Sequence, residues 1–218
     1  MKRNVSLDEI SDGKLYQLND MVKADCADCR GCSSCCKGMG NSIVLDPYDV
    51  YRLSIATGKS FQQLLTDHLD LSMKDGVILP TLRMVGEEES CSFLSKEGRC
   101  EIHTYRPGIC RLFPLGRFYE NHSFQYFLQI HECEKKNRLK IKVHKWIDTK
   151  DPIRYDAYIL DWHYYLNDFS EKILAASSEE EQKELIKYIL LQYYYKGFET
   201  DQDFYEQFYH RRNYTPFV

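Results

Sequence analysis

Nine cysteines are the residues of this chain best suited to chemistry, and five of them are crowded into residues 26–36. Two cysteines separated by two residues can present both sulfurs to one metal from a single tight turn. Soft thiolates select zinc, Cu(I) and iron–sulfur clusters over cations that prefer oxygen. The sequence therefore predicts a thiolate metal site, whose candidate ligands are Cys26, Cys29, Cys32, Cys35, Cys36, Cys91, Cys100, Cys110 and Cys133.

Spacing leaves the identity of the metal open. The cysteines that fit the C-x2-C-x2-C-x3-C run of bacterial ferredoxins are Cys26, Cys29, Cys32 and Cys36. This run favours an iron–sulfur cluster as the cofactor, although Lys37 replaces the proline that follows it in ferredoxins. Zn2+ is the alternative, because Cys29 and Cys32 could join two distant cysteines, such as Cys91 and Cys110, in a tetrahedral site. Nine cysteines suffice for two sites of four thiolates each.

The start of the chain and its charge limit where it works and what it binds. Residues 1–9 become acidic where a secretory signal needs its apolar stretch, so we expect a cytoplasmic protein. In that reducing compartment, clustered cysteines are more often metal ligands or redox centres than disulfides. The net charge of -4 at pH 7 gives no basic field for nucleic acid, and no run is apolar enough to span a membrane. We therefore expect neither nucleic acid nor membrane as a partner, whereas a protein partner stays open.

Four separated blocks of sequence occur in the order found in a known family. They are Cys29-x2-Cys32-x2-Cys35-Cys36, Cys91-Ser-Phe-Leu, Gly98-Arg99-Cys100-Glu-Ile-His and Arg106-Pro107-x-x-Cys110-Arg111-x-Phe113-Pro114. Over about residues 26–133 the chain resembles the YkgJ family of cysteine-cluster proteins. The resemblance implies a CxxCxxCC domain that chelates zinc or iron, with Cys133 as its late cysteine. Cys26 lies outside the core motif, and Ser33 stands where the family often has glycine.

The role of the metal is expected to be structural or redox, with two alternatives. One is a zinc-stabilised interaction module without catalysis. The other is a protein-modifying enzyme, because flagellin lysine methylases have a similar cysteine pattern. The chain has no GxGxxG motif, P-loop, Ser/His/Asp order or paired catalytic carboxylates. The sequence therefore leaves enzymatic activity open and identifies no catalytic residue.

Arg106 and Arg111 are the predicted cofactor-binding residues. A zinc site with four thiolates has a net charge of about -2, which nearby guanidinium groups would offset while they donate hydrogen bonds to sulfur. Arg117 is better explained as a surface residue. His103 and His131 lie close to ligand cysteines, but the thiolates already suffice, so we expect both histidines on the surface.

The elements that must position these residues indicate an α+β fold. Asp46-Pro47 predicts the start of a helix that ends at Gly58, and Ser60 with Gln63 predicts a second helix to about Met73. Extended runs are expected at residues 77–85, 91–94, 99–103, 113–119 and 124–130, with the last four forming two hairpins. Residues before 26 are expected to form a polar lead-in.

The last third of the chain has helical periodicity. Apolar residues recur at helical spacing from residue 155 onward, Ser178 with Glu181 predicts a cap, and a last short helix is expected from Thr200. We therefore predict a cysteine-rich domain over residues 20–147 and a helical C-terminal extension over 153–218 that packs on it.

The cysteine blocks are expected to meet in space, because each alone has too few spaced ligands for two sites. We expect the loop 26–36 to lie against residues 91–110 and near Cys133. Cys35 and Cys36 are expected to serve different metals, or to have one thiol facing the core, because successive side chains diverge along an extended backbone.

Overall fold

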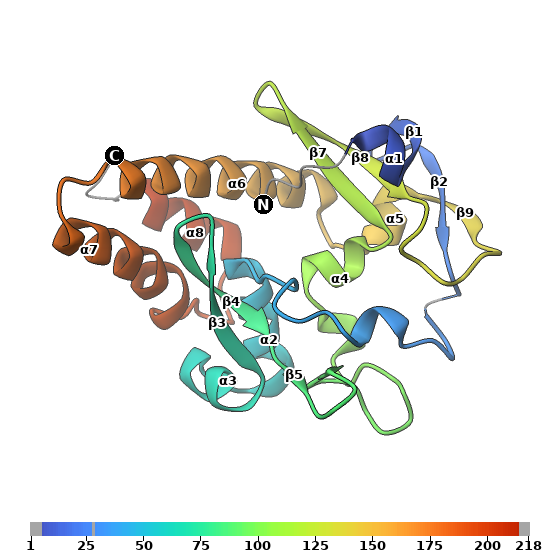
Figure 1. The fold of residues 1–218 in the computed structure, drawn as a ribbon, viewed down its shortest axis with the longest axis horizontal. Helices are drawn as coiled ribbons and strands as arrows, with labels where there is room; N and C mark the ends of the chain where they lie inside the picture. The colour runs from blue at the N-terminus through green and yellow to red at the C-terminus, as the bar shows by residue number, and fades with distance from the viewer. Residues whose placement is uncertain (1–5, 28, 214–218) are drawn as a thin grey trace.

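The computed structural model describes residues 6–27 and 29–213, and it has the predicted α+β architecture (Figure 1). The helices are α1 Leu7–Ile10, α2 Pro47–Thr57, α3 Phe61–Asp67, α4 Gly108–Leu112, α5 Val143–Ile147, α6 Pro152–Ala175, α7 Glu179–Leu190 and α8 Phe204–Asn213, with shorter helical turns η1 Ser34–Cys36, η2 His103–Tyr105 and η3 Leu191–Tyr195. The strands are β1 Ser11–Tyr16, β2 Met21–Asp25, β3 Leu69–Lys74, β4 Val77–Leu82, β5 Met84–Val85, β6 Ser90–Cys91, β7 Leu115–Glu120, β8 Ser123–Gln129 and β9 Leu139–Lys142. No helix in the described ranges is both long and apolar enough to cross a lipid bilayer.

The strands form small antiparallel sheets rather than one large sheet. The predicted hairpin near residues 113–130 is present as β7 and β8, which pair from Leu115↔Leu128 to Glu120↔Ser123. β1 pairs with the other edge of β8, and β2 pairs with β9. Residues 6–25 therefore form the short helix α1 and two strands instead of the expected lead-in, because the partner strands come from distant residues that local patterning does not reveal.

The two helices predicted after the cysteine loop are present, but the second is shorter than expected. Asp46 and Asp49 form a reciprocal capping box at α2, which ends at Gly58 in the left-handed region. Ser60 and Gln63 form the capping box of α3. The helix ends at Asp67, and residues 69–74 form strand β3 against β4 instead of continuing the helix. A partner strand that follows immediately in the sequence thus overrides the helical pattern.

The expected hairpin over residues 91–103 is reduced to one bridge. Leu94 pairs with Cys100 across the turn, while Cys91 pairs with Met84 in the β5–β6 ladder. In the second half only Cys100 pairs, Glu101 and Ile102 form a turn, and η2 begins at His103. Cys91 is thus placed by the short strand β6 and Cys100 by a single bridge followed by a turn.

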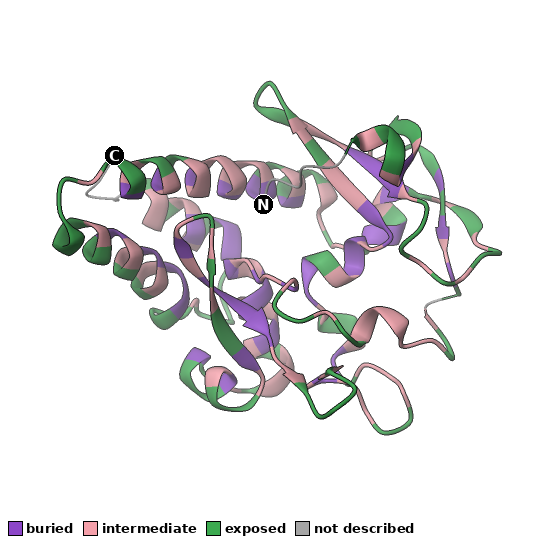
Figure 2. Cartoon of the chain, in the orientation of Figure 1, coloured by how far each residue is buried: buried purple, intermediate pink, exposed green. Residues whose placement is uncertain are grey.

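The C-terminal helices share their core with the cysteine-bearing part. α6 begins after Asp151, whose side chain accepts the Arg154 N–H, and runs between the β7–β8 hairpin and the helices α7 and α8 (Figure 1). Figure 2 shows the buried surface of α6 facing inward, where it meets β4 and α7. The Tyr194 hydroxyl donates to the Leu45 carbonyl at 2.9 Å, and the Tyr158 hydroxyl donates to Asp46 at 3.1 Å. Buried residues from Val22 to Phe208 belong to one hydrophobic cluster.

Candidate metal centre

All nine cysteines line a single cavity of about 160 Å³, which we call the cysteine basin. Its wall comes from the loop 26–36, from residues 91–110 and from the segment around Cys133. The structure thus brings together the three segments that were expected to meet. None of the nine is in a disulfide.

Tight turns shape the first part of the loop. Ala27 and Cys29 both have φ of 56° and Gly31 has φ of 65°, a left-handed backbone that curls the chain around its thiols. The Cys32 N–H donates to the Cys29 carbonyl at 3.1 Å, closing the next turn. As a result, the sulfurs of Cys26 and Cys29 lie 3.4 Å apart.

The second part of the loop corrects one expectation. Cys35 and Cys36 lie in the turn η1, where the Cys36 N–H donates to the Ser33 carbonyl at 2.8 Å. Because this backbone is helical and not extended, the two thiols do not diverge as predicted. The Cys36 thiol is close enough to be the main cause of a raised pKa at Cys35.

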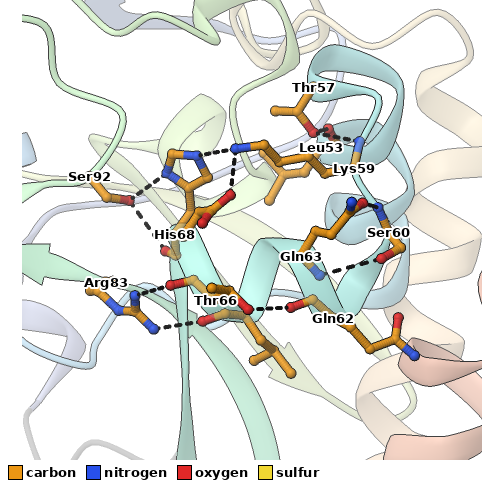
Figure 3. A network of polar contacts seen from close by, with 12 residues as sticks. Leu53, Thr57, Lys59, Ser60, Gln62, Gln63, Thr66, His68, Arg83 and Ser92 are labelled. Atoms are coloured by element: carbon orange, nitrogen blue, oxygen red, sulfur yellow. Dashed lines mark hydrogen bonds and ion pairs between the residues drawn. The ribbon is translucent and has the colours of Figure 1, made fainter.

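A polar network fixes the residues next to Cys91 (Figure 3). The Ser92 N–H donates to the Arg83 carbonyl at 3.0 Å, and its hydroxyl lies 3.3 Å from both the backbone oxygen and Nδ1 of His68. The His68 ring stacks on Phe93 with centroids 4.0 Å apart. Arg83 in turn donates to carbonyls at the end of α3, including that of Leu65. These contacts hold the strand β6 and Cys91 against the end of α3.

Cys110 is positioned by contacts on the far side of α4. The Gly108 N–H donates to Asp49 Oδ1 at 2.6 Å, and the buried Arg111 donates to the Ile147 carbonyl at 3.3 Å. A Cβ at Gly108 would lie 2.3 Å from the Tyr155 hydroxyl oxygen, so the helix packs against α6 at a distance that only glycine allows. Sequence reasoning missed Asp49, Gly108 and Tyr155 as positioning residues; the capping signal at α2 gave no sign of the contact with α4.

The late cysteine is joined to the loop by a side-chain contact. The Ser34 hydroxyl donates to the Glu134 carboxylate at 2.6 Å, next to Cys133. Both Ser34 and Cys133 line the basin. This contact closes the wall between the cysteine loop and the segment that follows β8.

Several thiols of the basin have shifted pKa values. Burial is the main cause of a raised pKa at Cys91, Cys100 and Cys110. At the contact between Cys26 and Cys29, the hydrogen bond lowers the pKa of Cys26 to about 6 and raises that of Cys29. Binding of a metal by these thiols would release their protons.

The predicted arginines separate into two groups. Arg106 lines the basin, and its positive charge lowers the pKa of both Cys29 and Cys100 against the larger effect of burial. Arg111 is not among the lining residues, because its side chain is buried behind α4 over the Tyr155 ring. The expected surface histidines also separate: His131 is exposed, whereas His103 lines the basin.

The donor set suits a soft metal, but it is not arranged around one point. Sulfur is the element that zinc and iron–sulfur clusters select, and the cavity gathers nine such donors. Within the described ranges, however, no three side chains of Cys, His, Asp or Glu converge closely enough to hold one ion. The chemistry of the basin therefore fits a thiolate-bound group, while its geometry leaves the individual ligands unassigned.

Comparison with known proteins supports the chemistry of the basin. A family model described as "CxxCxxCC: Putative zinc- or iron-chelating domain" matches residues 28–139, which is about half of the chain. This match confirms the resemblance seen in the sequence. No curated protein and no solved structure matches the chain.

Proposed function

Because the chain belongs to the CxxCxxCC family, we propose that its cysteine basin binds an iron–sulfur cluster that serves a structural or redox role. One observation carries this proposal: nine free cysteines from three segments line a single cavity. Nine free thiols also suit the reducing cytoplasm, which we propose as the compartment.

The spread of the thiols favours a cluster over a single ion. Four sulfurs bound to one zinc ion at about 2.3 Å must lie about 3.8 Å from one another. No three ligands among the described residues approach such an arrangement. In a [4Fe–4S] cluster each cysteine binds a different iron, so its thiolates are held further apart.

The ligands proposed first are Cys29, Cys32 and Cys36, which belong to both the ferredoxin-like spacing and the family motif, and Cys110, which belongs to the most distinctive of the later family blocks. The other five line the same wall and could complete a second site. Arg106 would offset the negative charge of the bound cluster and donate to its sulfur. When bound, the cluster would either store an electron, which is the redox role, or cross-link the three segments, which is the structural role.

A zinc centre without catalysis is the second candidate. It is supported by the pair Cys26 and Cys29, whose sulfurs are 3.4 Å apart, close to the separation that one tetrahedral ion requires. Such a site would stabilise the same three segments and leave the surface free for a protein partner.

Metal analysis of protein purified without air distinguishes the candidates. A cluster gives iron and acid-labile sulfide, with a brown colour that bleaches on oxidation. Zinc without colour supports the second candidate. A metal-free protein that stays folded and is unaffected by a chelator contradicts both, because thiolate metal sites contribute directly to folding.

A further inference from the structure

A second cavity, of about 430 Å³, lies between α6, β7 and the start of α2. We call it the arginine cavity, because Arg117 contributes to its wall. Most of the remaining wall is apolar and comes from residues such as Leu45, Leu79, Leu115 and Trp162. A mostly apolar cavity with a few polar groups is typical of a small-molecule site.

Arg117 has one donor that no described residue accepts. The residue is partly exposed, yet its Nε is shielded from solvent and has no hydrogen-bond partner. Its Nη2 lies 3.5 Å from the Tyr155 hydroxyl, and the guanidinium also hydrogen-bonds the side chains of Tyr119 and Tyr126. No carboxylate within residues 6–27 and 29–213 forms an ion pair with it.

Aromatic rings surround the guanidinium and leave its Nε without an acceptor. Its central carbon lies 5.5 Å from the Phe124 centroid, 5.7 Å from that of Tyr126 and 5.6 Å from that of Tyr155. Such contacts stabilise the positive charge through the ring faces. The five donors of a guanidinium point outward in its own plane and still require acceptors. A shielded donor without an acceptor is costly, so this group calls for a partner.

Other polar groups in the same wall are mostly donors or neutral. Tyr119 stacks on His163 with centroids 3.7 Å apart, and Asn167 lies 3.2 Å from the His163 ring nitrogen. Burial lowers the pKa of His163 to about 4, so it is neutral near pH 7. Together with Arg117 and Tyr155, these side chains offer hydrogen bonds to an acceptor.

The acidic residues of the cavity are already engaged. Asp46 accepts from the Asp49 N–H and from the Tyr158 hydroxyl, and Asp49 accepts from the Gly108 N–H. Burial raises the pKa of Asp46 and raises that of Asp49 to about 7, so the pair is not fully ionised at neutral pH. These carboxyl groups therefore serve the protein and do not replace the missing acceptor of Arg117.

The arginine cavity shares part of its wall with the cysteine basin. Ser42, Ile109, Leu115 and Gln129 line both. Ile109 immediately precedes Cys110 on α4, so the two cavities lie on either side of the helix that carries a proposed metal ligand. A molecule bound at Arg117 would thus be a close neighbour of the basin.

We propose that the arginine cavity binds a small organic carboxylate, with its carboxylate on Arg117 and its apolar part along α6. A carboxylate accepts two parallel hydrogen bonds from a guanidinium fork, and its charge complements the unpaired cation. Lys74 in the same wall donates to the neutral Asn41 amide and keeps its charge, so inorganic phosphate is included as a competing probe. This binding site stands apart from the metal centre and does not depend on it.

The test measures binding of matched acids and amides. The probes are benzoate, phenylacetate, 3-phenylpropionate and hexanoate, each beside its primary amide and beside inorganic phosphate. Binding is followed by calorimetry and by ligand-observed NMR, on the protein as purified. We expect at least one acid to bind and its amide to bind at least tenfold more weakly.

Variants locate the binding. Arg117→Met should weaken the acid at least tenfold, and Arg117→Lys should recover only part of the affinity because it lacks the fork. Leu166→Trp, which adds bulk to the cavity wall and keeps Arg117, should block binding too. The control Arg154→Met removes a surface arginine paired with Asp203 and should bind like the parent.

Several results would overturn the proposal. Equal binding of acids and amides, binding of phosphate alone, no binding of any acid up to 10 mM, or full binding by a folded Arg117→Met each contradicts it. Loss of metal in Arg117→Met is not expected. Metal content measured on the same samples therefore separates failure of this site from failure of the metal centre.

Discussion

The Asp49 carboxylate accepts the backbone N–H of Gly108 at 2.6 Å, which ties the first turn of α2 to the helix that carries Cys110. Asp49 is only 2 % exposed, and its other oxygen accepts the Asp46 N–H at 3.2 Å. One buried side chain thus caps its own helix and anchors a second one. Cys110 depends on this anchor for its place in the basin.

Removing the anchor should lower stability and metal retention together. Asp49→Ala leaves the Gly108 N–H without an acceptor, so we expect the free energy of unfolding to fall by about 1–3 kcal/mol. Asp49→Asn keeps an oxygen in place and should lose less. Urea unfolding and metal content of the purified variants are the measurements. An alanine variant as stable as the parent would contradict the anchoring role.

Gly108 should accept no larger residue. The Cβ of Gly108→Ala would lie 2.3 Å from the Tyr155 oxygen, so α4 or α6 must shift, at an expected cost of about 1–3 kcal/mol. Adding Tyr155→Phe removes that oxygen and should recover part of the loss. Gly197→Ala is the control, because no atom lies within 4 Å of its added Cβ. Denaturant unfolding of the single and double variants gives the coupling; additive effects would refute the steric explanation.

The cysteines should differ in how much metal depends on them. Cys29→Ser and Cys110→Ser should lose metal and destabilise the fold, because each removes a proposed ligand. Cys26 lies outside the matched family segment, so Cys26→Ser should lose less. Ser33→Ala in the same loop is the control. If Cys26→Ser empties the site while Cys110→Ser leaves it full, the ferredoxin-like run binds metal alone.

His163 should make the fold sensitive to mild acid. Its pKa falls from 6.5 to about 4 because of burial, so the unfolded chain takes up a proton at higher pH than the folded one. Stability is therefore expected to fall as the pH drops from about 6.5 to about 4. His163→Phe keeps the ring against Tyr119 and should flatten this part of the profile. The unfolding midpoint measured across this pH range is the test. The control is His131→Gln, which replaces an exposed histidine and should leave the pH profile of the parent unchanged. If His163→Phe also leaves the profile unchanged, His163 does not contribute to the acid sensitivity and the prediction is wrong.

The helical C-terminal part should be required for folding. A chain that ends after Ile147 lacks Tyr155 and Tyr158, which are fully buried, and lacks the Tyr194 hydroxyl that binds the Leu45 carbonyl. We expect it to be insoluble or digested rapidly by protease, whereas the whole chain resists. A truncated chain that unfolds cooperatively and keeps its metal would instead show that residues 20–147 form an independent domain.

Local chemistry in the sequence predicted much of this fold. The Asp46 and Ser60 caps, the β7–β8 hairpin and the helical spacing after residue 155 all appear in the structure, because each depends on neighbours a few residues apart. The predictions that failed depended on distant partners. The strand β1 needs β8, and β3 replaces the end of a predicted helix because β4 follows it.

The candidate site shows the same division. Cysteine spacing and the family motif predicted that three segments meet, and the basin gathers them. No pattern in the sequence indicated that Arg111 lies behind α4, or that Arg117 faces a cavity of its own. Both placements follow from Tyr155, a residue on α6 whose ring meets each arginine.

The basin is formed where three stretches of chain meet, and this has a consequence for how the sequence can vary in length. The segment between Cys36 and Cys91 includes α2, α3 and the β3–β4 hairpin. The tip of this hairpin, at Asp75 and Gly76, does not line the basin. Doubling the length of a flexible loop raises its closure entropy cost by only roughly 0.6 kcal/mol. Insertions at that tip should therefore be tolerated. A single residue added between Cys29 and Cys36 would instead change the direction of the thiols that follow it in the loop.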